Sequence, residues 1–139
     1  MIFQRAAERM TNMPESTSAV HIPHDHGQHI DQVLAKMPPE TEFGKASGVF
    51  QQLCDPSRLR ILWLLCHCEE CVYNLSAAVN MSSPAVSHHL RSLKQSGLLS
   101  CRRVGKEVHY RLADTEEAQL VHRMIDDIFD MNCPANSIR

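Results

Sequence analysis

The stretch NLSAAVNMSSPAVSHHLRSLKQSG, residues 74–97, contains two short helical patterns separated by a tight turn. Asn74 can cap the first helix, and Asn80, Met81 and Ser82 form the turn. Ser83 can cap the second helix, which has proline in its first turn. The helix ends before Gly97, because glycine readily adopts the left-handed conformation that terminates a helix. Two short helices joined in this way predict a helix-turn-helix.

The second helix of this stretch carries two kinds of side chain on opposite faces. At about 100° per residue, Val86, Leu90 and Leu93 fall within a narrow arc, which predicts that they face the core. The opposite face carries hydroxyl, imidazole, amide and cationic groups, which can reach base edges and phosphates. We therefore expect DNA contacts from Ser83, Ser87, His88, Arg91, Lys94 and Gln95.

The next segment predicts a two-stranded ribbon, with strands at 98–103 and 107–112, and polar and apolar residues alternate along the second strand. Residues 84–111 hold six cations and one anion, whereas residues 112–139 hold six anions and two cations. An ordinary solvent-exposed surface would explain each of these cations taken alone. It would not explain why they are confined to the segment that carries the capping and turn residues of a helix-turn-helix. We expect the ribbon to follow the DNA backbone through Arg102, Arg103, Lys106 and Arg111.

The rest of the chain is expected to support one domain. The expected division is a flexible, histidine-containing arm at 1–29, a winged helix-turn-helix domain at 30–131 and a tail at 132–139. Within the domain we expect the helix-turn-helix at about 74–96, the wing at 98–112 and a dimerisation helix at 115–131. Six cysteines, no secretory signal and no apolar run long enough to cross a bilayer predict a reduced, cytoplasmic protein without a membrane partner.

Two further helices bear on assembly. A helix at 40–53 is expected to bury four apolar side chains: Phe43, Val49, Phe50 and Leu53. The last helix repeats apolar residues at Leu120, Val121, Met124, Ile125, Ile128 and Phe129. Because a lone terminal helix cannot bury such a stripe, we expect a homodimer.

Four segments in order resemble the ArsR/SmtB family of metal-responsive repressors. They are LCDPSRLRIL at 53–62, EECVYNL at 69–75, SPAVSHHLRSL at 83–93 with GLL at 97–99, and RRVGKEVHYRL at 102–112. The resemblance implies a mostly α-helical fold with a small β-hairpin wing, dimeric through its first and last helices. It further implies a repressor that binds a near-palindromic, double-stranded operator and leaves it when an inducer binds.

The resemblance also implies a metal ion as inducer, and the chain offers two candidate sites. Related proteins close arm ligands onto a cysteine of the second segment, which here implies His24, His26 and Cys71. Two imidazoles and one thiolate suit zinc or another soft or borderline ion such as cadmium. Cys66 and Cys68 could join Cys71 only if the preceding helix ends at about Cys66. A histidine-rich stretch with no fixed partner is the alternative.

In zinc-sensing relatives the last helix carries a spaced set of aspartate and histidine ligands. The corresponding residues are Asp114, Glu116, Asp127 and Asp130, so both histidines are replaced by carboxylates. Such a site would favour manganese or magnesium. Arg123 lies on the same flank, and an ordinary salt-bridge network is the interpretation we favour. His122, beside Asp126, is expected at the surface.

The leading hypothesis is a repressor of a metal-resistance or export gene, derepressed by zinc, cadmium or a similar divalent cation. A metal-independent or thiol- or persulfide-responsive dimeric regulator is the alternative. Cys54 and Cys101 are expected to be buried small hydrophobes. The sequence has no nucleophile–base pair, phosphate loop or cofactor fingerprint, which predicts that the protein is not an enzyme.

Overall fold

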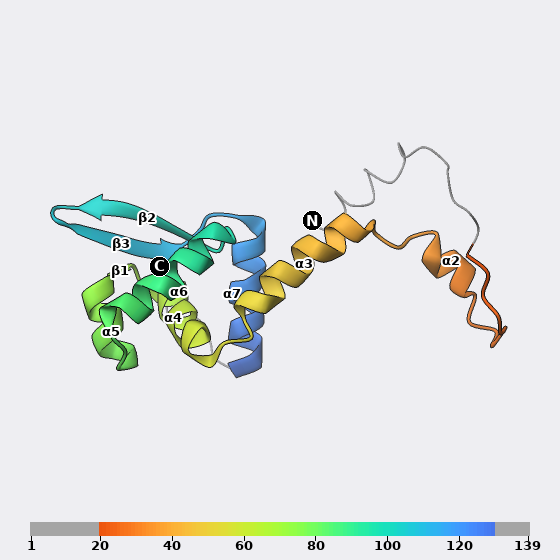
Figure 1. Ribbon diagram of the computed structural model, residues 1–139, viewed down its shortest axis with the longest axis horizontal. Coiled ribbons are helices and arrows are strands. Elements are labelled where there is room, and N and C mark those ends of the chain that lie inside the picture. Colours follow the sequence, from red (N-terminus) through yellow and green to blue (C-terminus); the bar gives the residue numbers. More distant parts are fainter. Residues whose placement is uncertain (1–19, 130–139) are drawn as a thin grey trace. The chain divides into compact units, whose positions relative to one another are not determined.

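The computed structural model describes residues 20–129, and no helix in that range is long and apolar enough to cross a membrane. The described residues fall into two compact units, residues 20–45 and residues 46–129. The described part of the first unit contains α2 (Ile30–Leu34). The helix α3 (Glu40–Gln52) begins in the first unit and ends in the second (Figure 1).

The second unit combines helices with a small antiparallel sheet. Its helices are α4 (Pro56–His67), α5 (Val72–Val79), α6 (Ser83–Gln95) and α7 (Glu116–Phe129). Its strands are β1 (Glu70–Cys71), β2 (Leu99–Val104) and β3 (Glu107–Leu112), in the order β1-β3-β2. Residue 101 of β2 pairs with residue 110 of β3, and the hairpin of these two strands forms the wing (Figure 1). The mostly α-helical winged helix-turn-helix predicted from the sequence is confirmed.

The turn lies between α5 and α6, as the capping and turn residues predicted. Two of the predicted capping residues are wrong. Ser82, not Ser83, caps α6, because its Oγ accepts a hydrogen bond from the Ala85 backbone N–H at 3.3 Å. The helix α5 begins at Val72, so Asn74 lies inside it and donates from Nδ2 to Glu70 Oε2 at 2.8 Å. Asn74 therefore anchors the start of α5 to β1 instead of capping the helix.

The start of α4 depends on Asp55. Its Oδ1 accepts a hydrogen bond from the Arg58 backbone N–H at 2.9 Å, and this bond holds the pKa of Asp55 below its ordinary value of 3.8. A carboxyl with a depressed folded pKa contributes stability that is present above its unfolded pKa. That contribution is lost as the pH falls through the folded pKa.

We therefore expect Asp55→Asn to leave stability at neutral pH nearly unchanged, because asparagine caps helices about as well as aspartate. The same variant should lose stability less steeply than the wild type in the acid range below 3.8, since it has no carboxylate to protonate. Urea unfolding followed by circular dichroism across this range measures both slopes. Equal acid slopes in the two proteins would contradict this role for Asp55.

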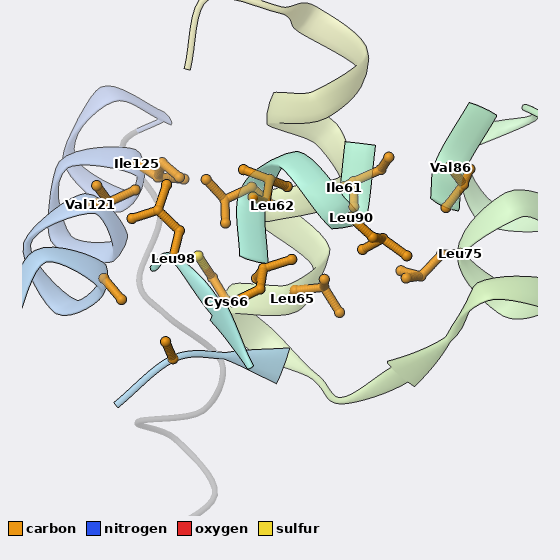
Figure 2. Packing of buried hydrophobic residues seen from close by; sticks show 14 of the residues in the cluster. Ile61, Leu62, Leu65, Cys66, Leu75, Val86, Leu90, Leu98, Val121 and Ile125 are labelled. Atoms are coloured by element: carbon orange, nitrogen blue, oxygen red, sulfur yellow. The ribbon is translucent and has the colours of Figure 1, made fainter. Parts of the chain in front are cut away.

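One hydrophobic core joins α4 to the other helices of the second unit. Val86, Leu90 and Leu93 of α6 are fully buried in it, which confirms the predicted inner ridge of that helix. Figure 2 shows side chains of α4 at the centre of the cluster, with Val121 and Ile125 of α7 on one side. The core therefore fixes which face of α6 is turned away from the protein.

The apolar residues of α3 and α7 are not all buried, contrary to the prediction for α3. Phe43 and Phe50 are 51% and 58% exposed, whereas Val49 packs half-buried against the core. The reason is geometric: Phe43 and Phe50 lie seven residues apart on one face of the helix, and Val49 lies on another. In α7, Leu120 and Ile128 are 43% and 71% exposed.

Candidate DNA-binding surface

The outward face of α6 presents most of the side chains predicted to contact DNA. His88, Arg91, Lys94 and Gln95 are exposed, and Ser87 is half-buried beside them. These residues and the buried ridge lie on one 13-residue helix, so the packing of the ridge sets their direction. This arrangement gives α6 one apolar side and one side of hydrogen-bonding and cationic groups.

Ser83 has a different environment from the rest of the predicted set. It is half-buried, and its Oγ accepts a hydrogen bond from Ser76 Oγ at 3.3 Å. This contact links the first residue of α6 to α5. On the other flank, Ser92 Oγ donates to Gln52 Oε1 at 2.8 Å, which ties α6 to the end of α3. The serines of α6 thus fix its position as well as contributing to its surface.

The wing cations are exposed, and three of them have partners within the chain. Arg102 Nε lies 2.6 Å from Glu69 Oε1, Arg103 Nε donates to the Gly105 carbonyl at 3.3 Å, and Arg111 Nε to Ser100 Oγ at 3.4 Å. Lys106, also exposed, lies in the turn beside Gly105. The pair with Glu69 was not predicted, because the two residues are 33 positions apart and no spacing rule links them.

A thiol adjoins the last turn of α6. A hydrogen bond with the Cys101 side chain raises the pKa of Lys94 above its ordinary value of 10.5. Cys101 is half-buried and not fully enclosed, and Cys54 is exposed, with Sγ donating to the Phe50 carbonyl at 3.3 Å. The prediction of burial is therefore wrong for Cys54, which follows the end of α3 at the surface, and only partly right for Cys101.

We expect Glu69→Gln to raise DNA affinity by up to about fivefold for each subunit that contacts DNA, or about 30-fold for a dimer. Surface ion pairs are worth roughly 0–1 kcal/mol, and Arg102 must leave its carboxylate partner before it can contact a phosphate. Fluorescence anisotropy with a labelled duplex at fixed salt measures the change. Adding Arg102→Ala should cancel the gain, and a gain that persists in the double variant would refute this explanation.

The ligands predicted for the arm site are described in separate units. His24 and His26 belong to the first unit, with stacked rings whose centroids are 6.0 Å apart. Cys71 belongs to the second unit, where it is buried at the start of α5. The helix α4 ends at His67, and Cys68 is exposed with Sγ donating to the Leu64 carbonyl at 3.2 Å. Residues 20–129 contain no three-ligand cluster that includes Cys71.

The carboxylates predicted on the last helix are exposed. This holds for Asp114, Glu116 and Asp127, while Asp130 lies outside the described residues. No ion pair links Arg123 to an acidic residue within the described part of one chain. The favoured salt-bridge network is therefore not formed there, because these side chains extend into solvent instead of meeting.

His122 is the clearest departure from the sequence prediction. Its side chain is only 16% exposed, and its Nε2 lies 3.3 Å from Asp126 Oδ2. Asp126 Oδ1 in turn lies 3.5 Å from Nε2 of His67, the last residue of α4. The prediction of a surface histidine is wrong because this face of α7 packs on the end of α4. The spacing of His122 and Asp126 was visible in the sequence, but the approach of His67 depends on the fold.

Comparison with known proteins agrees with this architecture. Residues 55–100 match the family described as bacterial regulatory protein, arsR family. The chain is 39% identical over 103 residues to a transcriptional repressor SmtB homolog of Synechocystis sp., covering 72% of this chain and 78% of that protein. It is 47% identical over 66 residues to the arsenical resistance operon repressor of Escherichia coli, covering 47% of this chain and 56% of the relative.

A solved structure has the same fold. HlyU from Vibrio cholerae superposes with a TM-score of 0.61 at 27% identity, covering 67% of this chain and all (100%) of that one. The matched segment at 55–100 contains α4, the helix-turn-helix and the start of the wing. With its relatives and its winged helix-turn-helix, this chain belongs to the ArsR/SmtB family of bacterial transcriptional repressors, which are DNA-binding regulators and not enzymes.

Proposed function

We propose that this chain acts as a homodimeric repressor that holds double-stranded operator DNA through α6 and the wing and leaves it when a divalent metal ion binds. The observation that carries the proposal is the two-sided character of α6. Its inner side is fully buried at Val86, Leu90 and Leu93, and its outer side presents His88 and Arg91 to solvent.

The chemistry of the outer face suits a major groove. An arginine can donate two hydrogen bonds to guanine, and serine and histidine side chains can reach base edges or phosphates. The exposed wing arginines, Arg102, Arg103 and Arg111, would neutralise phosphates beside that groove. We therefore assign sequence selection to α6 and general affinity to the wing.

The dimer is supported by an apolar strip on the surface of α7. Leu120, Met124 and Ile128 follow one another at intervals of four residues, and the first and last are exposed. The helix already buries Val121 and Ile125 in its own core, so this strip is a second apolar face. A second copy of the chain would cover it, in keeping with the symmetry of most soluble oligomers.

The inducer is the part of the proposal that depends most on the relatives. Two of them are named for SmtB and for arsenical resistance, which favours a metal or metalloid signal. The donors His24, His26 and Cys71 would suit zinc or cadmium, and the carboxylates Asp114, Glu116, Asp127 and Asp130 are a weaker, all-oxygen candidate. A coupling of a few kcal/mol, within the usual allosteric range of about 1–3 kcal/mol, would suffice to empty the operator.

The proposal is tested by titrating zinc, cadmium, lead, nickel and copper into the protein bound to DNA from upstream of its own gene. We expect at least one of these ions to release the labelled duplex, as measured by anisotropy, and a chelator to restore binding. Release that is weaker in Cys71→Ser would support the arm site. If none of the ions releases the duplex, metal sensing is refuted, whereas the assignment of DNA binding to α6 stands.

A further inference from the structure

Three potential metal ligands meet where the end of α4 packs on the middle of α7. They are His67 from α4 and His122 and Asp126 from α7, and their ligand atoms all lie within 4.8 Å of one another. The two histidine Nε2 atoms approach opposite oxygens of the same carboxylate, at 3.5 Å and 3.3 Å. All three side chains belong to the second unit, so one folded chain brings them together.

Three polar atoms of this cluster are buried and lack hydrogen-bond partners in the described chain. Nε2 of His67, Nε2 of His122 and Oδ1 of Asp126 are inaccessible to solvent and accept or donate no hydrogen bond within the described chain. An unsatisfied buried polar atom costs roughly 1–3 kcal/mol, and charged groups cost more. Three such atoms pointing at one spot therefore indicate that something else satisfies them.

The contact of His67 with the backbone shows which ring nitrogen carries a hydrogen and which one faces Asp126. Its Nδ1 lies 2.7 Å from the Trp63 carbonyl oxygen. Since a carbonyl can only accept, Nδ1 carries the hydrogen, and Nε2 of the neutral ring presents a lone pair to the Asp126 carboxylate. Two acceptors that face each other need a cation between them. An imidazole that donates its second N–H to a backbone carbonyl is also the usual arrangement of a metal-bound histidine.

The ligand atoms lie close enough together to surround one small ion, since one atom from each residue lies within 4.8 Å of the other two. Zinc–nitrogen and zinc–oxygen bonds of about 2.0–2.1 Å at tetrahedral angles place neighbouring ligand atoms about 3.3–3.4 Å apart. The two nitrogen–oxygen distances, 3.5 Å and 3.3 Å, are of this size but involve opposite oxygens of Asp126, so an ion bound to one oxygen would require small shifts of these side chains. Two imidazoles and one carboxylate also leave a fourth position for water, and the set suits borderline ions such as zinc and cobalt.

We propose that His67, His122 and Asp126 form a binding site for zinc or a similar borderline divalent ion within each chain. The site differs from both candidates on the arm and the last helix, with which it shares no residue. It joins the helix that directly precedes the helix-turn-helix to the helix that carries the exposed apolar strip. The regulatory role of the site rests on the proposed function: an ion there would couple the dimer helix to α5 and α6.

The alternative is a protonated His67 paired with Asp126, and metal binding distinguishes the two. Zinc and cobalt are titrated without DNA into full-length protein carrying His24→Gln, His26→Gln and Cys71→Ser, which removes the arm candidate. We expect one ion per chain and a tetrahedral cobalt absorption spectrum with no thiolate charge-transfer band. Trp63, the only tryptophan, packs on His67 with ring centroids 4.6 Å apart, so its fluorescence should change on binding.

Variants then locate the ion. Since loss of even a supporting residue weakens metal sites by about 10- to 100-fold, His122→Gln and Asp126→Asn should each weaken zinc binding by at least about 100-fold. Glu117→Gln changes an exposed carboxylate of the same helix and should bind zinc like its parent. Circular dichroism shows whether each variant folds. If Asp126→Asn unfolds, thermal melting of the other proteins still locates the ion. Zinc should raise the melting temperature of the protein that lacks the arm ligands, and it should not raise that of the same protein with His122→Gln.

Two outcomes would overturn the site: zinc affinity unchanged in both His122→Gln and Asp126→Asn, or no cobalt and zinc binding once the arm ligands are removed. Because these titrations contain no DNA, failure of the operator model cannot produce either result. A second set of titrations adds the labelled duplex. If zinc binds at the site but does not release DNA, the coupling is refuted and the site stands.

Discussion

Arg91→Ala lowers operator affinity by roughly 30-fold or more. A bidentate arginine–guanine contact is worth about 1–3 kcal/mol, and a dimer loses two, so the total is about 2–6 kcal/mol. Arg91 is exposed on the outer face of α6, away from the buried ridge, so its truncation should leave the fold intact. Adding Ser87→Ala and His88→Ala should leave only the salt-dependent affinity that the protein has for any duplex.

Anisotropy titrations at fixed salt, with specific and random duplexes, measure this loss of selectivity. Arg123→Ala is the matched control, because it removes one exposed cation from α7 instead of α6. We expect it to change affinity little. Equal losses in the two variants would mean that net charge, and not the face of α6, determines binding.

Ile128→Glu should convert the protein to a monomer and weaken operator binding by at least about 100-fold. Linking two binding modules commonly raises overall affinity by about 10²–10⁴, and that gain disappears when the modules separate. Ile128 is largely exposed in the single chain, so the new carboxylate is solvated in the monomer but must be buried unpaired in the dimer. The effect should therefore fall on assembly and not on folding.

Sedimentation equilibrium gives the mass, and circular dichroism reports the fold. Gln119→Glu adds the same charge to an exposed position of α7 that lies about 100° around the helix from Leu120. This control should remain dimeric. A dimeric Ile128→Glu variant with full DNA affinity would show that the strip on α7 is not the interface.

The helix-turn-helix could be predicted from the sequence because local rules govern it. The spacing of Val86, Leu90 and Leu93 determines the buried side of α6 whatever the rest of the chain does. Gly97 adopts a φ of 81°, a conformation that glycine accepts without strain, and so ends the helix as predicted. The alternating pattern of 107–112 likewise predicted β3 within its observed bounds, Glu107–Leu112.

Features that depend on tertiary contact could not be predicted in this way. The hydrophobicity of Phe43 and Phe50 suggested burial, but an exposed apolar face can equally be a surface that binds another protein. The pair of His122 and Asp126 was visible at a spacing of four residues, yet only the packing of α4 on α7 brings His67 to it. The prediction of a surface position for His122 therefore missed the one three-ligand cluster of residues 20–129.

Dimethyl sulfate footprinting tests the central claim most directly, because it reads guanine N7 in the major groove and adenine N3 in the minor groove. The duplex is one that the wild-type protein selects from a random pool. A dimer that inserts α6 into successive major grooves should protect guanine N7 in two patches about 10 base pairs apart, or a multiple of that distance. Arg91→Ala, at a concentration that saturates the duplex, should lose protection within both patches. Protection confined to adenine N3, or guanine patches identical in the two proteins, would contradict the assignment of α6 as the element that reads DNA.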